Sequence, residues 1–174
     1  MSDLEKLADV VKEWRDSAAL FVSDQFGVTP TAQQKALLDA ASKPGAHVAV
    51  KSGHGTGKST TLAWLALWGL CCFEDVKVPC TAPTGHQLED VLWSEIEKWR
   101  ARMLEPWRSA ISVTSDAVKI AGLPNFAAAR TGRKENPEAL QGFHADTLLF
   151  LVDEASGIPD QVFEVARGAL STPG

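Results

Sequence analysis

Residues 46–59, Ala-His-Val-Ala-Val-Lys followed by Ser-Gly-His-Gly-Thr-Gly-Lys-Ser, decide the fold of this chain. The first part is an apolar run, and residues 60–68, Thr-Thr-Leu-Ala-Trp-Leu-Ala-Leu-Trp, follow the glycines as a second apolar stretch. The order predicts a strand, a glycine-rich turn and a helix. A turn of this composition between a strand and a helix is what a phosphate-binding P-loop requires.

The residue types in the turn suit a nucleoside triphosphate. Glycines let consecutive backbone N–H groups point inward, and the first turn of the following helix adds unpaired N–H groups and the positive end of its dipole. We expect Lys58 to reach the β- and γ-phosphates and the Ser59 hydroxyl to bind Mg²⁺. Ser52 stands where the pattern has its first glycine, so the loop is interpreted as a variant. The predicted nucleotide-binding residues here are Ser52, Gly53, His54, Gly55, Thr56, Gly57, Lys58, Ser59 and Thr60.

Length and composition indicate one globular domain with a substantial core. The chain has 174 residues, of which 45% are hydrophobic, and a formal net charge of -5. It has no apolar stretch of membrane-spanning length and begins with an acidic sequence, so we predict a cytosolic protein with no membrane partner. The negative net charge argues against nucleic-acid binding over the whole surface, although one face can differ. Three cysteines, two of them adjacent, indicate buried thiols rather than disulfides or a zinc site.

Residues 1–45 are predicted to form a helical segment that contributes contacts on the adenine side, and residues 46–174 to form the nucleotide-binding core. A capping-box pattern at Ser2 and Glu5, with apolar residues at steps of three and four, predicts a first amphipathic helix that reaches Phe21. This helix is expected to pack on the core or on a neighbour.

A second helix is expected to begin at Thr31. Gln34 then has two interpretations. It can complete a capping box with Thr31. Alternatively, Gln34 or Gln33 can recognise adenine, since an amide donates and accepts hydrogen bonds at once; of the two, Gln34 is the preferred adenine contact.

A second strand is predicted at residues 76–82 and a long helix at 84–103. Pro79 cannot donate a backbone hydrogen bond, so this strand is either short or unpaired on one side at that residue. Two short strands at 111–114 and 117–120 are expected to form a hairpin. Basic residues gather near the end of the long helix and fit either a solvated face or a DNA contact: Lys98, Arg100, Arg102 and Arg108.

The third predicted strand, residues 147–152, is a continuous apolar run typical of the buried centre of a parallel sheet. It ends in Asp153 and Glu154. A carboxylate at the tip of a central strand beside a P-loop is placed to bind Mg²⁺, so we assign Asp153 to the metal together with Ser59. Glu154 is the predicted general base that polarises the attacking water. A helix is expected at 158–170.

Lys58 and Asp153 are 95 positions apart, with the predicted strand at 76–82 between them. This spacing leaves room for an inserted strand, and with Glu154 it favours the RecA-like hydrolytic branch over the small-molecule kinases. We therefore predict an α/β fold of the RecA-like P-loop NTPase type, with a mostly parallel sheet flanked by helices. The sheet is expected to be cut short after the Asp153 strand and the helix that follows it.

The sequence resembles the large terminase subunits of tailed bacteriophages, the ATPases that package DNA into procapsids. The resemblance rests on residues 52–59, on Thr-Ala-Pro-Thr at 81–84 with the Gln-Leu and Leu-Trp pairs after it, on 137–144, and on Val-Asp-Glu-Ala-Ser-Gly-Ile-Pro at 152–159. It implies a motor domain that uses ATP and Mg²⁺ to translocate double-stranded DNA in the cytoplasm of the bacterial host. It also implies the portal, the small terminase subunit and further copies in a ring as partners.

The resemblance leaves the source of one positive charge open. In many relatives an arginine within the phosphate loop is thought to help hydrolysis, but His54 occupies that place here. The charge is then expected from Lys51, or from Arg130 or Arg133 reaching the γ-phosphate of a neighbouring subunit. Both arginines lie in a predicted loop at 121–145, and a solvated loop is the alternative for each. Full-length relatives resemble two-domain proteins with an RNase H-like nuclease domain, which this chain does not supply.

Other functions remain open at this point. A DEAD-type helicase or a related remodelling ATPase fits Asp153-Glu154-Ala155 and the upstream glutamine as well. A module that binds a nucleotide without turning it over is a second alternative. A small-molecule phosphotransferase is disfavoured, because Glu154 suits attack by water.

Overall fold

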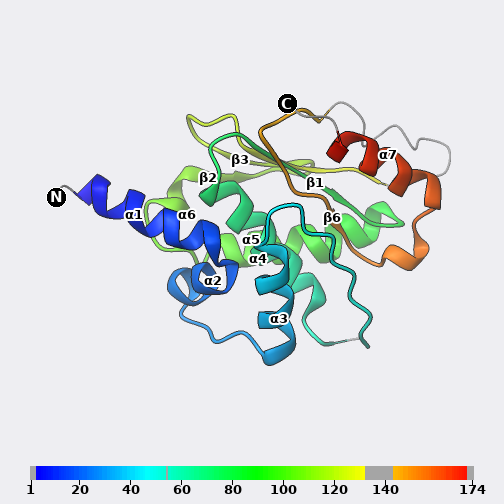
Figure 1. The fold of residues 1–174 in the computed structure, drawn as a ribbon, viewed down its shortest axis with the longest axis horizontal. Coiled ribbons are helices and arrows are strands. Elements are labelled where there is room, and N and C mark those ends of the chain that lie inside the picture. The colour runs from blue at the N-terminus through cyan, green and yellow to red at the C-terminus, as the bar shows by residue number, and fades with distance from the viewer. Residues whose placement is uncertain (1–2, 54, 132–142, 172–174) are drawn as a thin grey trace.

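A mixed β-sheet with helices around it forms the protein in the computed structural model, which describes residues 3–53, 55–131 and 143–171 (Figure 1). The strands are β1 (Val76–Thr81), β2 (Ile111–Val113), β3 (Ala117–Ile120), β4 (Phe126–Ala129), β5 (Thr147–Leu148) and β6 (Leu151–Val152). They follow the order β2-β3-β4-β1-β5, and β6 also pairs with β1. Strand β1 runs parallel to β4, β5 and β6, whereas β3 is antiparallel to both β2 and β4.

The sheet is therefore mixed: the prediction of parallel strands holds for the pairs of β1 with β4, β5 and β6 and is wrong for the pairs of β3 with β2 and β4. The segments that connect these strands are short, and a parallel neighbour would need a longer crossover. The predicted hairpin is confirmed as β2 and β3, in which Ile111 pairs with Ile120. Strand β4 lies in the stretch predicted as a loop. The sequence did not indicate this strand, because Phe-Ala-Ala-Ala is poor in the residues that favour strands.

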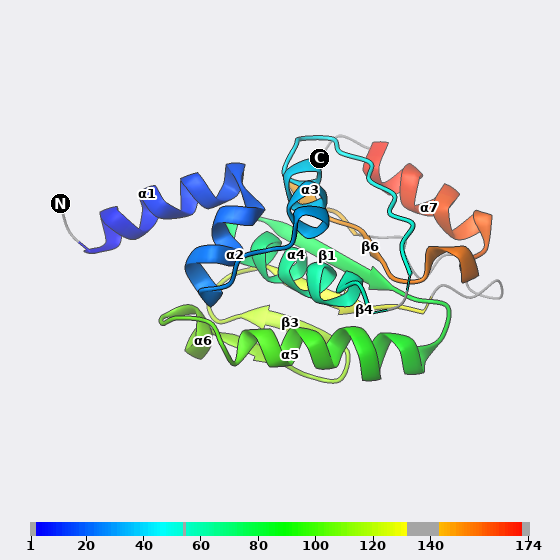
Figure 2. The ribbon, with the colours of Figure 1, turned by 90° about the horizontal axis from the view of Figure 1, so that it is seen from below.

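The helices surround the sheet on several sides (Figure 2). They are α1 (Asp3–Asp16), α2 (Ala18–Phe26), α3 (Ala32–Ala41), α4 (Lys58–Cys72), the π-helix η1 (Gln87–Trp93), α5 (Ser94–Arg100), α6 (Trp107–Ala110), the 3₁₀ turn η3 (Ala155–Gly157) and α7 (Asp160–Ser171). The first predicted helix is divided, because Ser17 caps α2 by accepting a hydrogen bond from Leu20 N. The predicted helix at 158–170 is confirmed as α7.

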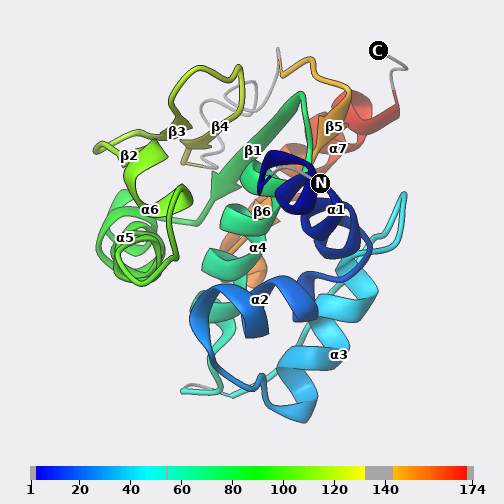
Figure 3. The ribbon, with the colours of Figure 1, turned by 90° about the vertical axis from the view of Figure 1, so that its left-hand side faces the viewer.

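Helix α4 occupies the middle of the molecule, between the sheet, α5 and the N-terminal helices (Figure 3). Almost every residue from Thr61 to Cys72 is buried. T-shaped ring contacts connect Trp64 of α4 to Trp99 of α5, and Trp99 in turn to Phe26 of α2. Helices α1 to α3 share this hydrophobic cluster, so these N-terminal helices pack onto the core. Their separate adenine-side role stays a prediction.

The structure contradicts the strand predicted at residues 46–51. This segment is extended, but residues 46–50 belong to no strand of the described chain. A strand requires a hydrogen-bonded neighbour at about 4.8 Å, and the sheet ends at β5 and β6 on this side. Val48 and Val50 are consequently 43% and 50% exposed. The apolar run indicated a strand, but apolarity alone does not supply the pairing partner.

The third predicted strand is interrupted, and Pro79 of β1 explains the interruption. Leu149 N donates to Lys77 O at 3.0 Å. The reciprocal parallel-ladder bond to Leu149 O would need an N–H at position 79, which proline lacks. The ladder resumes where Cys80 is level with Leu151, so the predicted strand becomes β5 and β6. The side of β1 left free at Pro79 is thus the side that faces β5 and β6.

Successive residues from 149 to 152, in β6 and just before it, alternate between two hydrophobic clusters. Leu149 and Leu151 belong to the cluster that contains α4. Phe150 and Val152 pack with Ile158 and α7 instead. Helices α4 and α7 therefore cover opposite faces at β6, and the carboxyl end of this strand lies between them.

The three cysteines are buried and free, as the sequence predicted. Burial raises the pKa of the Cys71, Cys72 and Cys80 thiols above their ordinary value. Such thiols are protonated at neutral pH and poor metal ligands. Within the described ranges, no cluster of His, Cys, Asp and Glu side chains has the composition of a multi-ligand metal site.

Candidate nucleotide-binding site

The glycine-rich turn leads directly into α4, as predicted. Gly55 and Gly57 have φ values of 74° and 78°, in the left-handed region that side chains with a Cβ rarely adopt. A Cβ at Gly57 would also lie 2.6 Å from Gln34 Nε2 of α3. Glycine at position 57 is therefore required both by the backbone conformation and by the close approach of Gln34.

Hydrogen bonds within the turn hold the loop around the Lys58 side chain. Lys58 Nζ donates to Ser52 O at 3.2 Å and to Gly53 O at 3.0 Å. The Ser52 and Thr56 hydroxyls are 2.8 Å apart, and Thr56 Oγ1 donates to Gly53 O. Ser52, which departs from the usual pattern, thus supports the loop through its carbonyl and its hydroxyl. His54 lies outside the described residues.

The structure brings together the two residues that the sequence assigned to a metal. Ser59 Oγ, in the first turn of α4, donates a 3.1 Å hydrogen bond to Asp153 Oδ2 at the end of β6. Asp153 is 5% exposed, and its Oδ1 accepts from Glu154 N at 3.0 Å. The P-loop helix and the third predicted strand, 94 positions apart, therefore meet at one carboxylate.

Glu154 has an unusual backbone conformation. Its φ of 49° and ψ of 49° place it in the left-handed region, and it is the one non-glycine residue with positive φ among the described parts of the chain. Non-glycine residues in this region carry strain, which often accompanies functional sites. The turn η3 that follows packs against Pro83, two residues after the end of β1, since a Cβ at Gly157 would lie 2.6 Å from Pro83 Cγ.

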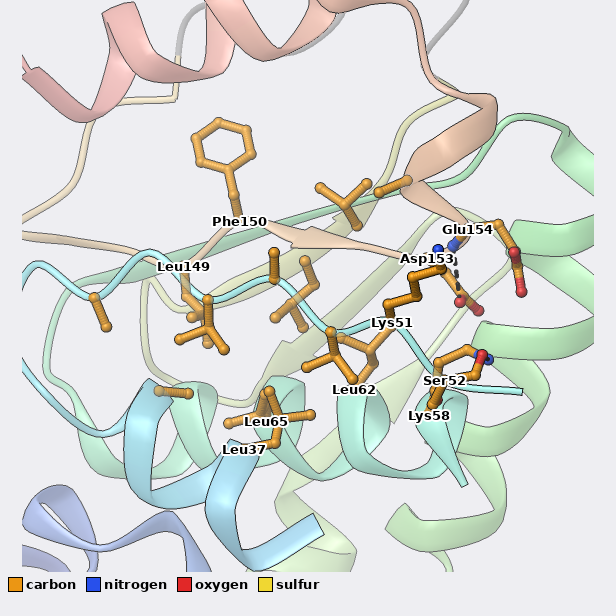
Figure 4. Close-up of a pocket in the computed structure, with 18 of the residues that line it drawn as sticks. Leu37, Lys51, Ser52, Lys58, Leu62, Leu65, Leu149, Phe150, Asp153 and Glu154 are labelled. Carbon is orange, nitrogen blue, oxygen red and sulfur yellow. Dashed lines mark hydrogen bonds between the residues drawn. The ribbon is translucent and has the colours of Figure 1, made fainter. Parts of the chain in front are cut away.

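A groove of about 680 Å³ runs from the P-loop along β6 (Figure 4). Lys51, Lys58, Asp153 and Glu154 lie at its polar end. The remainder is mostly apolar and is bounded by the extended segment 46–50 on one side and by residues 149–152 on the other. The groove therefore joins a charged end, where a phosphate chain can be held, to an apolar length.

Gln34 takes part in a capping box, which confirms the first of its two interpretations. Its Oε1 accepts from Thr31 N, and its own N–H donates to Thr31 Oγ1. The opposite end of the amide approaches the P-loop at Gly57. Gln34 therefore lies next to the P-loop, and its recognition of adenine stays a prediction.

Arg130, one of the residues proposed to supply charge, does not line the groove. Arg130 follows β4, where its N–H donates to Cys80 O of β1. Its guanidinium donates to Ala129 O and lies 6.0 Å from the centre of the Phe143 ring. Arg133 lies outside the described residues. Lys51 lines the groove beside Lys58, so of the two described candidates the groove favours Lys51 over Arg130.

Sequence reasoning missed one residue next to this site. Glu95 of α5 accepts a hydrogen bond from Thr60 Oγ1, so the hydroxyl of Thr60, a residue predicted to bind the nucleotide, is used within the protein. The available signal was a carboxylate on the apolar face of a helix whose other members include Leu92, Ile96 and Trp99. A charge at such a position is expected to have a partner.

The chain is similar along most of its length to a protein of Enterobacteria phage P7 described as a probable terminase, large subunit. The two are 33% identical over 170 residues, which is 91% of this chain and 34% of the relative. The chain is homologous to part of a large terminase subunit. The resemblance predicted from the sequence is thereby confirmed.

The homology covers about a third of that large terminase subunit, so it does not by itself describe the activity of this chain. No protein-family model matches the chain. Among the described residues, none of the helices has the length and apolarity needed to cross a membrane.

Proposed function

We propose that this chain is an ATP-hydrolysing portion of a terminase motor that translocates double-stranded DNA into a phage procapsid. The observation that carries the proposal is the hydrogen bond between Ser59 and Asp153. Two oxygen donors about 3 Å apart have the separation of neighbouring ligands in an octahedral Mg²⁺ site. The residues present therefore fit Mg²⁺ and a triphosphate.

Each residue of the site would have a separate role in ATP binding and hydrolysis. The first turn of α4 offers backbone N–H groups that have no acceptor within the helix. Lys58 exchanges its contacts with Ser52 O and Gly53 O for phosphate oxygens. Ser59 and Asp153 would hold Mg²⁺, which would offset the negative charge of the triphosphate. Glu154 accepts a proton from the attacking water, which a carboxylate at the groove end is placed to do.

The proposal extends to the partners of the complete protein. On the basis of the terminase homology, the proposed partners are double-stranded DNA, the portal, the small terminase subunit and other copies in a ring, and the proposed location is the cytoplasm of an infected bacterium. Arg130 or Arg133 would serve a neighbouring copy, since Arg130 does not line the groove of its own chain.

Two substitutions test the assigned roles. Lys58→Ala should abolish ATP binding, whereas Glu154→Gln should retain binding and lose turnover in the complete protein, because only the proton acceptor is removed. Binding is measured by calorimetry and turnover by phosphate release. Lys119→Ala, which removes an exposed lysine on β3, is the matched control and should leave both unchanged.

Three results would contradict this scheme. Unchanged ATP binding by Lys58→Ala would remove the P-loop assignment. Equal loss of binding in Lys58→Ala and Glu154→Gln would remove the distinction between a phosphate ligand and a base. Binding without turnover in the unsubstituted complete protein would favour the nucleotide-dependent binding module instead.

A further inference from the structure

Thr60 is the neighbour of Ser59 in the first turn of α4, yet its side chain makes its contact away from the P-loop. Thr60 Oγ1 donates a 2.9 Å hydrogen bond to Glu95 Oε2 of α5. The same oxygen accepts from Trp99 Nε1 at 3.0 Å, and Glu95 Oε1 accepts from Lys98 Nζ at 2.7 Å. What Thr60 retains for a phosphate is its backbone N–H.

Glu95 lies in the contact between α5 and α4. Its side chain is 22% exposed, and the Trp99 ring beside it packs on the Trp64 ring of α4 with centroids 5.0 Å apart. A partly buried carboxylate needs hydrogen-bond donors to offset its lost hydration, and three donors converge on Glu95. One of those donors is a residue of the P-loop helix itself.

The two adjacent hydroxyls fix the first turn of α4 from two sides. Successive residues of an α-helix project about 100° apart around its axis. Ser59 reaches β6 through Asp153, and Thr60 reaches α5 through Glu95. Together the two bonds restrain rotation of the turn about the helix axis, so release of one side lets the Ser59 hydroxyl move relative to Asp153.

We propose that Glu95 is a positioning residue of the nucleotide site. By holding Thr60, it orients Ser59 toward Asp153 and thereby sets the affinity for the Mg²⁺ complex of ATP. This inference rests on the proposed function and adds a residue outside the P-loop and β6 that controls metal-dependent binding.

The test measures ATP affinity of the full chain with and without Mg²⁺. With Mg²⁺, Thr60→Val and Glu95→Ala should each weaken binding about tenfold, the amount expected for one hydrogen bond to a charged group. The double variant should be no weaker than the poorer single variant, because both remove the same bond. Without Mg²⁺ each change should stay below about twofold, since the contacts of Lys58 and the backbone remain.

Matched variants separate positioning from general damage. Glu97→Ala removes a carboxylate from the same helix that pairs with Arg100 instead, and it should leave Mg²⁺-dependent affinity unchanged. Thr60→Ser keeps the hydroxyl and should bind as the unsubstituted chain does. Glu95→Gln keeps the shape of the side chain and one acceptor, so it should fold and lose less ATP affinity than Glu95→Ala. If the alanine variant unfolds, Glu95→Gln takes its place in the test.

Several outcomes would overturn the inference. These are unchanged affinity in Thr60→Val and Glu95→Gln, equal losses with and without Mg²⁺, or additive losses in the double variant. Lys58→Ala distinguishes failure of the proposed function from failure of the positioning role of Glu95. If it binds ATP normally, the proposed function is wrong; if it loses binding while the Thr60 and Glu95 variants are normal, only the positioning role is wrong.

Discussion

Asp153 is the residue at which the two halves of the candidate site meet. Each of its carboxylate oxygens accepts one hydrogen bond, from the Ser59 hydroxyl and from the Glu154 backbone. The second bond holds the backbone immediately before η3, where Glu154 adopts its left-handed conformation. One buried carboxylate therefore orients both the proposed metal ligand of the P-loop helix and the proposed base.

The strain at Glu154 predicts a difference between two substitutions that remove the same carboxylate. Glu154→Gly should be more stable to urea than Glu154→Ala by about 1 kcal/mol, because only glycine adopts left-handed φ without a Cβ conflict. The comparison is made from unfolding midpoints at equal slopes. Equal stability of the two variants would mean that the position carries no backbone strain.

The carboxyl of Glu95 predicts a pH dependence. Burial raises the pKa of Glu95, but hydrogen bonds from Lys98, Thr60 and Trp99 together outweigh burial and bring it below its ordinary value of 4.5. A lowered pKa contributes stability that is fully present above the unfolded value and is lost as the pH falls through the folded one.

The unsubstituted chain should therefore exceed Glu95→Gln in unfolding free energy near neutral pH. This difference in unfolding free energy should narrow as the pH falls below about 4.5 and disappear at lower pH. Urea unfolding of both proteins across this range measures the gap. A gap that widened in acid would contradict the lowered pKa.

Residue identity and spacing predicted the charged end of the site but not its supports. Lys58, Ser59 and Asp153 could be named because their chemistry depends on residue type at the turn and at a strand end. The contact of Glu95 with Thr60 could not, since it depends on how α5 packs across α4. The sequence assigned Thr60 to the nucleotide without naming an atom, whereas in the structure its hydroxyl donates to a carboxylate.

At the scale of elements, Pro79 determines how the third predicted strand is divided. Its missing N–H falls opposite Leu149 O, between the paired ends formed by β5 and β6. Pro79→Ala should therefore create a new ladder bond, seen as a slowly exchanging amide at position 79 by hydrogen exchange. Val76 N–H, elsewhere on β1, serves as the internal reference.

Stability should change little in Pro79→Ala. A new hydrogen bond contributes about 1 kcal/mol, while loss of proline restores a similar amount of unfolded-state freedom. Rapid exchange of the new amide at position 79 would be inconsistent with the division of the strand by proline, provided that the reference amide on β1 remains protected.

The elements that sequence predicted well are those whose signals are local. The P-loop helix, β1, the β2–β3 hairpin and α7 each have a cap, a turn or a periodic apolar face within their own residues. The segment 46–51 was predicted wrongly because a strand also needs a neighbour, and residues 46–50 have none in the described chain. The pairing direction of β4 likewise depends on a partner distant in sequence.

At the scale of the whole molecule, charge is arranged in local pairs near the end of α5. Lys98 pairs with Glu95 at 2.7 Å, Arg108 with Glu105 at 2.9 Å, and Arg100 with Glu97. The guanidinium of Arg102 lies over the Trp99 ring, 5.0 Å from its centre. This pairing favours the solvated-face interpretation of the basic cluster over a DNA contact.

The pairing leads to a prediction about DNA binding by the protein. The double substitution of Arg100→Gln and Arg108→Gln should leave both the affinity for double-stranded DNA and its salt dependence unchanged, because these cations already face carboxylates. Had both arginines contacted phosphates, the slope of log affinity against log salt would fall by about 1.8 for the two lost contacts. Fluorescence anisotropy across a salt series measures the slope, and thermal melting checks folding, which exposed pairs of this kind affect by less than about 1 kcal/mol. A reduced slope in a folded variant would assign the DNA contact to this end of α5 and show that the acidic partners release their arginines to the duplex.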